Sequence, residues 1–244
     1  MVPGIKVDSG TRPLAKSDKE LITEGLDGLP ARLEEYRARG ARFAKWRAVF
    51  SIGGGAPSQM ALAANAHSLA RYAMHCQEAD LVPIVEPEIL MAGDHSIEDS
   101  LAATTAVLRE VFSALRAFEI DLGGMILKPS MVTPGAARSQ AEPREVAAAT
   151  LECFLDCVPA SLAGIALLSG GQSDQVAVAN LEAINQHSAL PWPVTFSFGR
   201  ALQDAAMSAW SSSGLDREST QRTLLERAEA ASCAVQARRL VNAL

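Results

Sequence analysis

Short apolar runs recur six times along the chain, and longer stretches with the spacing of amphipathic helices separate them. The strand-like runs cover residues 4–8, 42–49, 81–89, 124–131, 164–168 and 193–198. The clearest helical stretches cover residues 57–78 and 96–118. Strands that are joined by helical crossovers must be parallel. The pattern therefore predicts an α/β protein, built either as a wound sheet or as a (β/α) barrel.

Residues typical of helix starts support this prediction of helices between strands. Ser96 is followed by Glu98 and Asp99, whose charges suit the positive end of a helix, and Pro143 is typical of a first helical residue. Beyond the last predicted strand, residues 200–210 and 218–241 have helical spacing, with a break at 211–214.

Polar residues two positions apart stand at the C-terminal ends of four predicted strands, so each pair shares one side of its strand. The pairs are Lys6 with Asp8, Lys45 with Arg47, Glu86 with Glu88, and Lys128 with Ser130. The residues between and beside them, such as Val7, Trp46 and Val85, are apolar and are expected to face the helices. Polar groups gathered at this end of parallel strands are typical of a TIM-type barrel, whereas an open sheet binds at a single switch point. No nucleotide-binding glycine motif is present.

Lys128 is the strongest candidate for chemistry. It ends the apolar run in GGMILKPSMVTPG, where Pro129 stops any helix, so we expect its amine at the end of a core strand. Partial burial disfavours the ammonium form, and a neutral amine attacks carbonyls to form a Schiff base. The alternative is an ordinary lysine with a buried stem and a solvated head.

Three neighbouring residues strengthen the hypothesis that Lys128 forms a Schiff base. Lys45 is a second inward amine that would repel a proton from Lys128, and Glu86 and Glu88 supply carboxylates for the proton transfers that imine formation requires. A salt-bridge cluster that fills the barrel is the competing explanation for any single pair.

Glycines follow the last two strands, in LLSGGQSD and in SFGR. Exposed backbone N–H groups there would form a phosphate cradle, in the place where barrels commonly bind phosphate. Its predicted members are Ser169, Gly170, Gly171, Gly199 and Arg200. A glycine after a strand more often only forms a turn, so either motif alone is weak evidence for a phosphate site. The two motifs together are stronger evidence.

Composition narrows the class of protein. Hydrophobic residues make up 48% and charged residues 20% of the 244 residues, as in a globular protein long enough for one large domain. The net charge of −6 argues against nucleic acid or an anionic membrane as the partner. The N-terminus lacks signal-peptide features, no stretch reaches the ~18 apolar residues of a membrane span, and four cysteines form no C-x-x-C pair. We expect a soluble cytoplasmic protein with buried, reduced thiols, and the scattered histidines predict no metal site.

Together these motifs closely resemble class I fructose-bisphosphate aldolase. The segments are GIKVDSG, FAKWR, VPIVEPEIL, ILKPSMVTPG, LLSGGQS with NLEAIN, and FSFGRALQ with AW, in family order across essentially the whole chain. The resemblance implies that residues 1–244 form a single aldolase barrel domain that needs no metal or cofactor.

The resemblance also implies roles for residues. Lys128 matches the Schiff-base lysine and Glu86 the acid/base for carbinolamine and iminium steps. Lys45 matches a lysine near the cleaved bond, and Glu88 the carboxylate that orders the lysines. Ser169, Gly170, Gly199 and Arg200 match the phosphate site of the ketone half, and Lys6 and Arg47 match cations near the other phosphate.

The chain also departs from the family pattern. Relatives carry two further barrel strands before the position of Met1, including one with an aspartate that takes part in carbon bond cleavage. We therefore expect six of eight βα units, with unpaired backbone groups along residues 2–7 and 194–198, and a chain that aggregates readily unless another chain covers those edges. Ser130 stands where asparagine is common.

The leading functional hypothesis is reversible cleavage of fructose 1,6-bisphosphate to dihydroxyacetone phosphate and glyceraldehyde 3-phosphate by a cytoplasmic homo-oligomer. The alternative is a catalytically impaired barrel fragment that binds phosphosugars or only associates with other subunits. The KWR and VEPEI motifs disfavour another Schiff-base lyase such as transaldolase.

Overall fold

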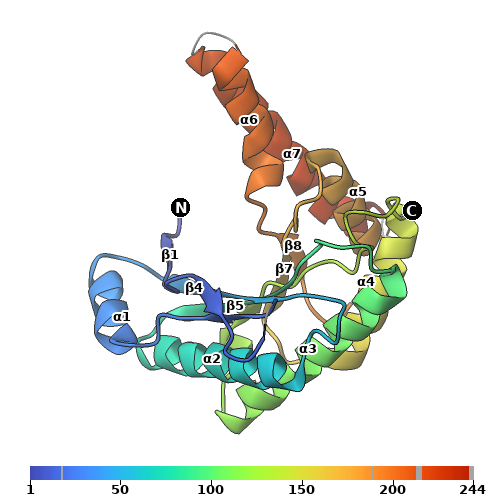
Figure 1. Cartoon of the computed structure of the whole chain (residues 1–244). Coiled ribbons are helices and arrows are strands. Elements are labelled where there is room, and N and C mark those ends of the chain that lie inside the picture. Colours follow the sequence, from blue (N-terminus) through green and yellow to red (C-terminus); the bar gives the residue numbers. More distant parts are fainter. Residues whose placement is uncertain (18, 188–189, 213–215, 242–244) are drawn as a thin grey trace.

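Parallel strands form one sheet, with helices packed along its outer face (Figure 1). The computed structural model describes residues 1–17, 19–187, 190–212 and 216–241. The sheet strands are β1 (Gly4–Lys6), β4 (Phe43–Phe50), β5 (Val82–Ile89), β6 (Ile126–Leu127), β7 (Gly164–Leu167) and β8 (Val194–Phe196). The helices are α1 (Leu29–Ala38), α2 (Gln59–Glu78), α3 (Ile97–Ala117), α4 (Pro143–Cys157), α5 (Asp174–Asn185), α6 (Arg200–Ser212) and α7 (Arg217–Val241), with a short 3-10 turn η1 (Leu122–Gly124) before β6.

The strand order in the sheet is β1-β4-β5-β6-β7-β8, and every neighbouring pair is parallel. A sheet whose spatial order follows the chain is that of a (β/α) barrel, whereas the order of an open wound sheet reverses at a switch point. This confirms the predicted α/β class and six βα units. Within the described residues β1 and β8 do not pair with each other, so the sheet is open between them.

The predicted strands were correct in place but too long at several ends. The ladder of β6 spans only two residues, because Pro87 in the facing strand β5 has no N–H to continue it past Lys128. A small antiparallel hairpin, β2 (Thr11–Pro13) with β3 (Leu21–Thr23), fills the first loop and was not predicted, since strands of three residues are too short to show the alternation of a half-buried strand. Helix α1 was also missed.

Helix starts agree with the sequence signals. At α3, Ser96 and Asp99 form a capping box: the Asp99 N–H donates to Ser96 Oγ at 3.1 Å and the Ser96 N–H donates to Asp99 Oδ2 at 2.9 Å. The bond from the Ser96 N–H holds the pKa of Asp99 below its ordinary value. Helix α4 begins at Pro143, as expected.

One hydrophobic core lies between the sheet and the helices. Trp46, Val85 and Val7, which alternate with the polar residues of their strands, are at most 2% exposed. The predicted parity of the strands is therefore correct, and the polar partners must point to the other side of the sheet.

Tyr72 of α2 completes the pairing of β4 with β5. Its hydroxyl accepts from the Ile84 N–H at 3.1 Å and donates to the Ala44 carbonyl at 2.7 Å, so it stands inside the ladder next to Pro83. The side chain is fully buried, and burial raises the pKa of Tyr72 well above its ordinary value. The raised pKa favours the protonated hydroxyl, which can donate.

The cysteines follow the expectation of buried thiols only in part. Cys76 and Cys153 are buried, and burial raises the pKa of each thiol to about 12. Cys157 is half-buried and Cys233 is exposed on α7, so the apolar pattern predicted too much burial for these two.

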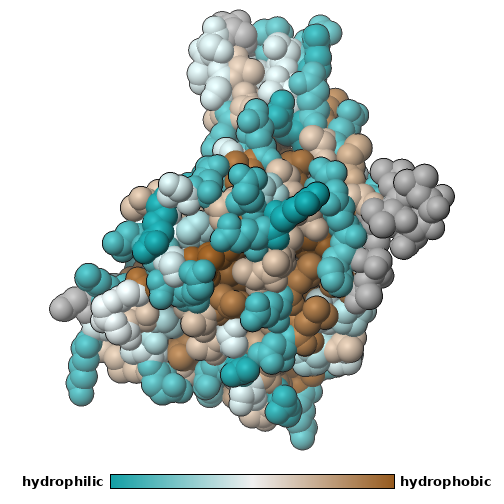
Figure 2. Space-filling view, turned by 90° about the vertical axis from the view of Figure 1, so that its right-hand side faces the viewer, coloured by the Kyte–Doolittle hydropathy of each residue, from teal (hydrophilic) through white to brown (hydrophobic). Residues whose placement is uncertain are grey.

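Helices α6 and α7 pack against each other, and α6 projects with the first part of α7, whereas α7 also packs against α5 (Figure 1). Met207 and Leu225 are more than half exposed on this pair. On the face shown in Figure 2, apolar side chains gather among hydrophilic ones below the projecting helices. Within the described residues, no helix combines the length and apolar character that a membrane crossing requires.

Tyr72→Phe tests the hydroxyl in the ladder. The substitution takes one hydrogen-bond partner from the Ile84 N–H and one from the Ala44 carbonyl, which should lower the free energy of unfolding by about 1 kcal/mol in urea. Tyr36→Phe is the matched control, because its hydroxyl makes no hydrogen bond within the described residues. Equal stability of the two variants would contradict the role given to Tyr72.

Candidate functional site

The parallel register brings three ionisable side chains together at the ends of β4, β5 and β6. Arg47 lies opposite Glu86, and Val85 lies opposite Leu127. The Lys128 N–H donates to the Val85 carbonyl at 2.7 Å, so the same register places Lys128 beside Glu86. The predicted gathering of polar groups at the C-terminal ends of the strands is thus present in the structure.

Glu86 occupies the centre of this group and is 4% exposed. Its Oε1 lies 2.8 Å from Lys128 Nζ, and its Oε2 accepts a hydrogen bond from Lys45 Nζ. The side chains of Lys128 and Lys45 are 11% and 20% exposed. One carboxylate therefore binds both amines in a setting with little water.

The charges of this cluster do not balance when all three groups are ionised. Two ammonium groups face one carboxylate, which leaves a net charge of +1 in a largely buried site. The sequence predicted a dry amine at Lys128, and the structure adds that the carboxylate holding it is shared.

Glu88 differs from its expected place. We expected its carboxylate to order the lysines, but its Oε2 lies 2.5 Å from Arg47 Nε, and within the described residues it makes no hydrogen bond with Lys45 or Lys128. The register explains this, because each cation of β4 binds the carboxylate two residues beyond its ladder partner. The Glu88 carboxylate raises the pKa of Arg47 above its ordinary value.

Lys6 stands on the same rim, one strand away from Lys45. Its Nζ lies 2.5 Å from Asp8 Oδ1, and half of its side chain is exposed. Asp8 is buried and accepts hydrogen bonds from the Arg47 and Gly10 N–H groups, both at 3.1 Å. Asp8 thus ties β1 to β4 beneath two predicted phosphate-binding cations. The sequence marked Asp8 only by its parity with Lys6.

The predicted phosphate cradle lies in the loops after β7 and β8. Gly170 and Gly171 have φ values of 55° and 88°, which strain any other residue, and the Gln172 N–H donates to the Ser169 carbonyl at 2.9 Å. A Cβ at Gly171 would lie 3.8 Å from Arg200 Nη2, so the structure brings these two residues together. Gly199 directly precedes α6 and has open space around it.

Two further loops are joined by backbone hydrogen bonds. In the paired rim, which we define as residues 91–95 after β5 and 135–138 after β6, three N–H groups donate across the gap. They belong to Gly135, Ala136 and Ala137 and reach the carbonyls of His95, Met91 and Gly93 at 2.7–3.0 Å. Arg138 Nε donates to the Asp94 carbonyl as well. A side chain at Gly135 would collide with the Gly93 backbone.

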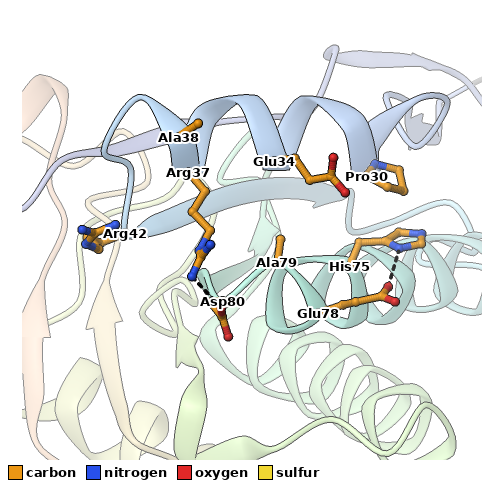
Figure 3. A pocket seen from close by; sticks show the side chains of 9 residues that line it. All are labelled: Pro30, Glu34, Arg37, Ala38, Arg42, His75, Glu78, Ala79 and Asp80. Atoms are coloured by element: carbon orange, nitrogen blue, oxygen red, sulfur yellow. Dashed lines mark hydrogen bonds and ion pairs between the residues drawn. The ribbon is translucent and has the colours of Figure 1, made fainter.

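A separate cavity of about 650 Å³ lies between α1 and α2 (Figure 3). Arg37 pairs there with Asp80 at 2.6 Å, and His75 points toward Glu78. Arg42, which precedes β4, also lines the cavity, so it opens at the end of the strands opposite to Lys128. None of the predicted site residues lines this cavity.

Metal ligation finds no support in the described part of the chain, where no three histidine, cysteine, aspartate or glutamate side chains are grouped to hold an ion.

Comparisons with known proteins agree with the geometry of the fold and site. The family described as "Fructose-bisphosphate aldolase class-I" matches residues 1–242. A probable fructose-bisphosphate aldolase class 1 of Xylella fastidiosa (strain Temecula1) is 55% identical over 212 residues, which cover 86% of this chain and 64% of the relative. Cytoplasmic isozyme 2 of Pisum sativum is 48% identical over 95% of this chain and 65% of its own length.

A solved structure extends the likeness to the fold. Fructose-bisphosphate aldolase from Plasmodium falciparum, crystallised with TRAP and a small-molecule inhibitor, superposes with a TM-score of 0.93 at 43% identity, covering 98% of this chain and 70% of that one. The chain thus has the α/β fold of a (β/α) barrel, with the sheet open between β1 and β8 within the described residues. It belongs to the class I fructose-bisphosphate aldolase family. It spans about 64% of the length of the bacterial relatives.

Glu86→Gln tests the shared carboxylate. Removing the charge leaves two amines in a nearly dry site, so the free energy of unfolding should fall by about 3 kcal/mol or more in urea. The additional change Lys45→Met should recover part of the loss, because one amine then disappears as well. Glu35→Gln breaks an exposed pair with Arg39 and should change stability by less than about 1 kcal/mol. Equal effects of the Glu86 and Glu35 changes would contradict the central place of Glu86.

Proposed function

We propose that the protein acts as an aldolase that cleaves fructose 1,6-bisphosphate reversibly to dihydroxyacetone phosphate and glyceraldehyde 3-phosphate. The names of its relatives support this reaction class. The observation that carries the mechanism is the buried Glu86 carboxylate between two amines, 2.8 Å from Lys128. We further propose that residues 1–244 belong to one barrel domain.

In this mechanism the neutral Lys128 amine attacks the ketone carbon and forms a carbinolamine. Glu86 lies within hydrogen-bond reach of Lys128 Nζ and carries the proton that the nitrogen loses to the former ketone oxygen. After taking up a second proton from solvent, Glu86 passes it to the hydroxyl, so water leaves and an iminium forms. A base then takes the proton of the hydroxyl beside the carbon–carbon bond. That bond breaks, its electron pair moves into the iminium, and an enamine and an aldehyde result. Protonation of the enamine carbon and hydrolysis then release the ketone product and restore Lys128.

The remaining predicted residues bind the substrate in this proposal. Lys45, on the other side of Glu86, assists near the bond that breaks. Ser169, Gly170, Gly171, Gly199 and Arg200 bind the phosphate of the ketone half through backbone N–H groups and the guanidinium. Lys6 and Arg47 attract the other phosphate from the β1 and β4 side, with Glu88 holding Arg47 in place. A phosphorylated sugar is thus the proposed ligand.

The names of two relatives support a location for the protein. Two plant relatives carry the words cytoplasmic or cytosolic in their names, and we propose the cytoplasm for this protein as well. A homo-oligomer remains a prediction of the sequence.

A second candidate function rests on the open sheet. Within the described residues no strand pairs with the outer edge of β1 or β8, so backbone groups of both strands face outward. This observation favours a barrel unit that binds phosphosugars without turnover or that associates with other subunits.

Borohydride trapping tests the proposed mechanism. Incubation with dihydroxyacetone phosphate and sodium borohydride should add one reduced adduct at Lys128, detected by mass spectrometry of peptides. Lys128→Met should abolish the adduct, whereas the exposed Lys19→Met should leave it unchanged. Glu86→Ala should slow trapping by about 100-fold, the scale of general acid catalysis.

The same experiment separates the two candidate functions. An adduct together with cleavage of fructose 1,6-bisphosphate supports the aldolase. An adduct at Lys128 with no measurable cleavage supports the second candidate, because the imine then forms and the later step fails. The Schiff-base mechanism is wrong for this protein if wild type and Lys128→Met gain the same mass.

A further inference from the structure

The backbone ladder between β5 and β6 stops at Lys128. The paired residues are Ile84 with Ile126 and Val85 with Leu127, and the last backbone bond is the one from the Lys128 N–H to Val85. Pro87 in β5 has no N–H to donate across the gap, and Pro129 faces the other neighbour, because its carbonyl accepts from the Leu168 N–H after β7 at 3.1 Å. Backbone pairing alone therefore leaves the segment after Lys128 without a fixed distance to β5.

The hydroxyl of Ser130 fills this gap. The Ile89 N–H donates to Ser130 Oγ at 2.9 Å, and the same hydroxyl donates to the Ile89 carbonyl at 3.2 Å. Both bonds are buried, and Ser130 is 5% exposed. A side chain thus supplies the donor and the acceptor that the interrupted ladder lacks.

Lys128 lies two residues before this anchor and one residue after the last backbone bond. Its backbone is fixed from both sides, which leaves the stem of the lysine as the only adjustable link to Glu86. Thr150 of α4 holds the next part of the loop by accepting from the Val132 N–H at 2.9 Å. Ser130 is the anchor closer to Lys128.

We infer that Ser130 is a positioning residue: its hydroxyl sets the place of the Lys128 backbone and so keeps Nζ in line with Glu86 and the substrate ketone. The inference deepens the proposed function and rests on it for its catalytic consequence. The part of the inference that concerns the position of the Lys128 backbone does not depend on the proposed reaction. Displacements of about 1 Å in a reacting group can slow a reaction by up to about 100-fold, so a single misplaced anchor is measurable.

The test compares Ser130→Ala with two reference variants. Ser130→Thr keeps the hydroxyl. Thr104→Ala removes another buried hydroxyl, which donates to the Ser100 carbonyl at 2.7 Å within α3 and lies on a helix rather than at the site. Thr104→Ala therefore reports the effect of a general loss of stability.

Two measurements are made on each variant. The first is the rate of borohydride trapping at saturating dihydroxyacetone phosphate. The second is the acetylation rate of Lys128 by acetic anhydride relative to that of exposed Lys19 in the same sample, read by mass spectrometry, which needs no activity. Wild-type Lys128 should react slowly because its amine is paired with Glu86 and largely buried.

Ser130→Ala should slow trapping about tenfold and raise the relative acetylation of Lys128 threefold or more, because the amine leaves Glu86. Ser130→Thr should restore both values, and Thr104→Ala should change neither. Wild-type values in Ser130→Ala, or the same changes in Thr104→Ala, overturn the inference. If wild type forms no adduct, the proposed function fails and acetylation alone decides: a rise confined to Ser130→Ala supports the positioning role, and an unchanged rate overturns it.

Discussion

The carboxylate of Glu86 lies between two amines in a site that contains almost no exposed surface. Burial of a carboxylate is costly unless its partners reach it in good geometry. Lys45 and Lys128 belong to different strands, so the pairing of β4 with β5 and of β5 with β6 must be accurate at this point. The rest of the fold can be understood as the means of holding that register.

Two buried hydroxyl groups bind the backbone on either side of β5. Tyr72 bonds to Ala44 of β4 and to Ile84 of β5, and Ser130 bonds to Ile89 where Pro87 ends the pairing of β5 with β6. Glu86 is therefore braced on each side by a side chain that does not touch the substrate.

Local sequence patterns predicted the strands that carry the chemistry, because β4 and β5 combine apolar alternation with polar ends. The same parity placed Lys45, Glu86 and Lys128 on one face. It did not predict that Glu88 binds Arg47, since the choice depends on a ladder offset of two residues between distant strands. The β2–β3 hairpin and the Tyr72 and Ser130 bonds were missed for a related reason: each depends on a partner, often far along the chain, that no short window contains.

The paired rim has a mechanical consequence for the active face. The backbone N–H groups of residues 135–137 donate to carbonyls of residues 91–95. The loop that continues from Glu86 and Glu88 is therefore bound to the loop that continues from Lys128. Neither loop can swing outward without breaking several bonds at once. Any opening of this side of the pocket mouth must therefore carry both loops together, as a single flap hinged on β5 and β6.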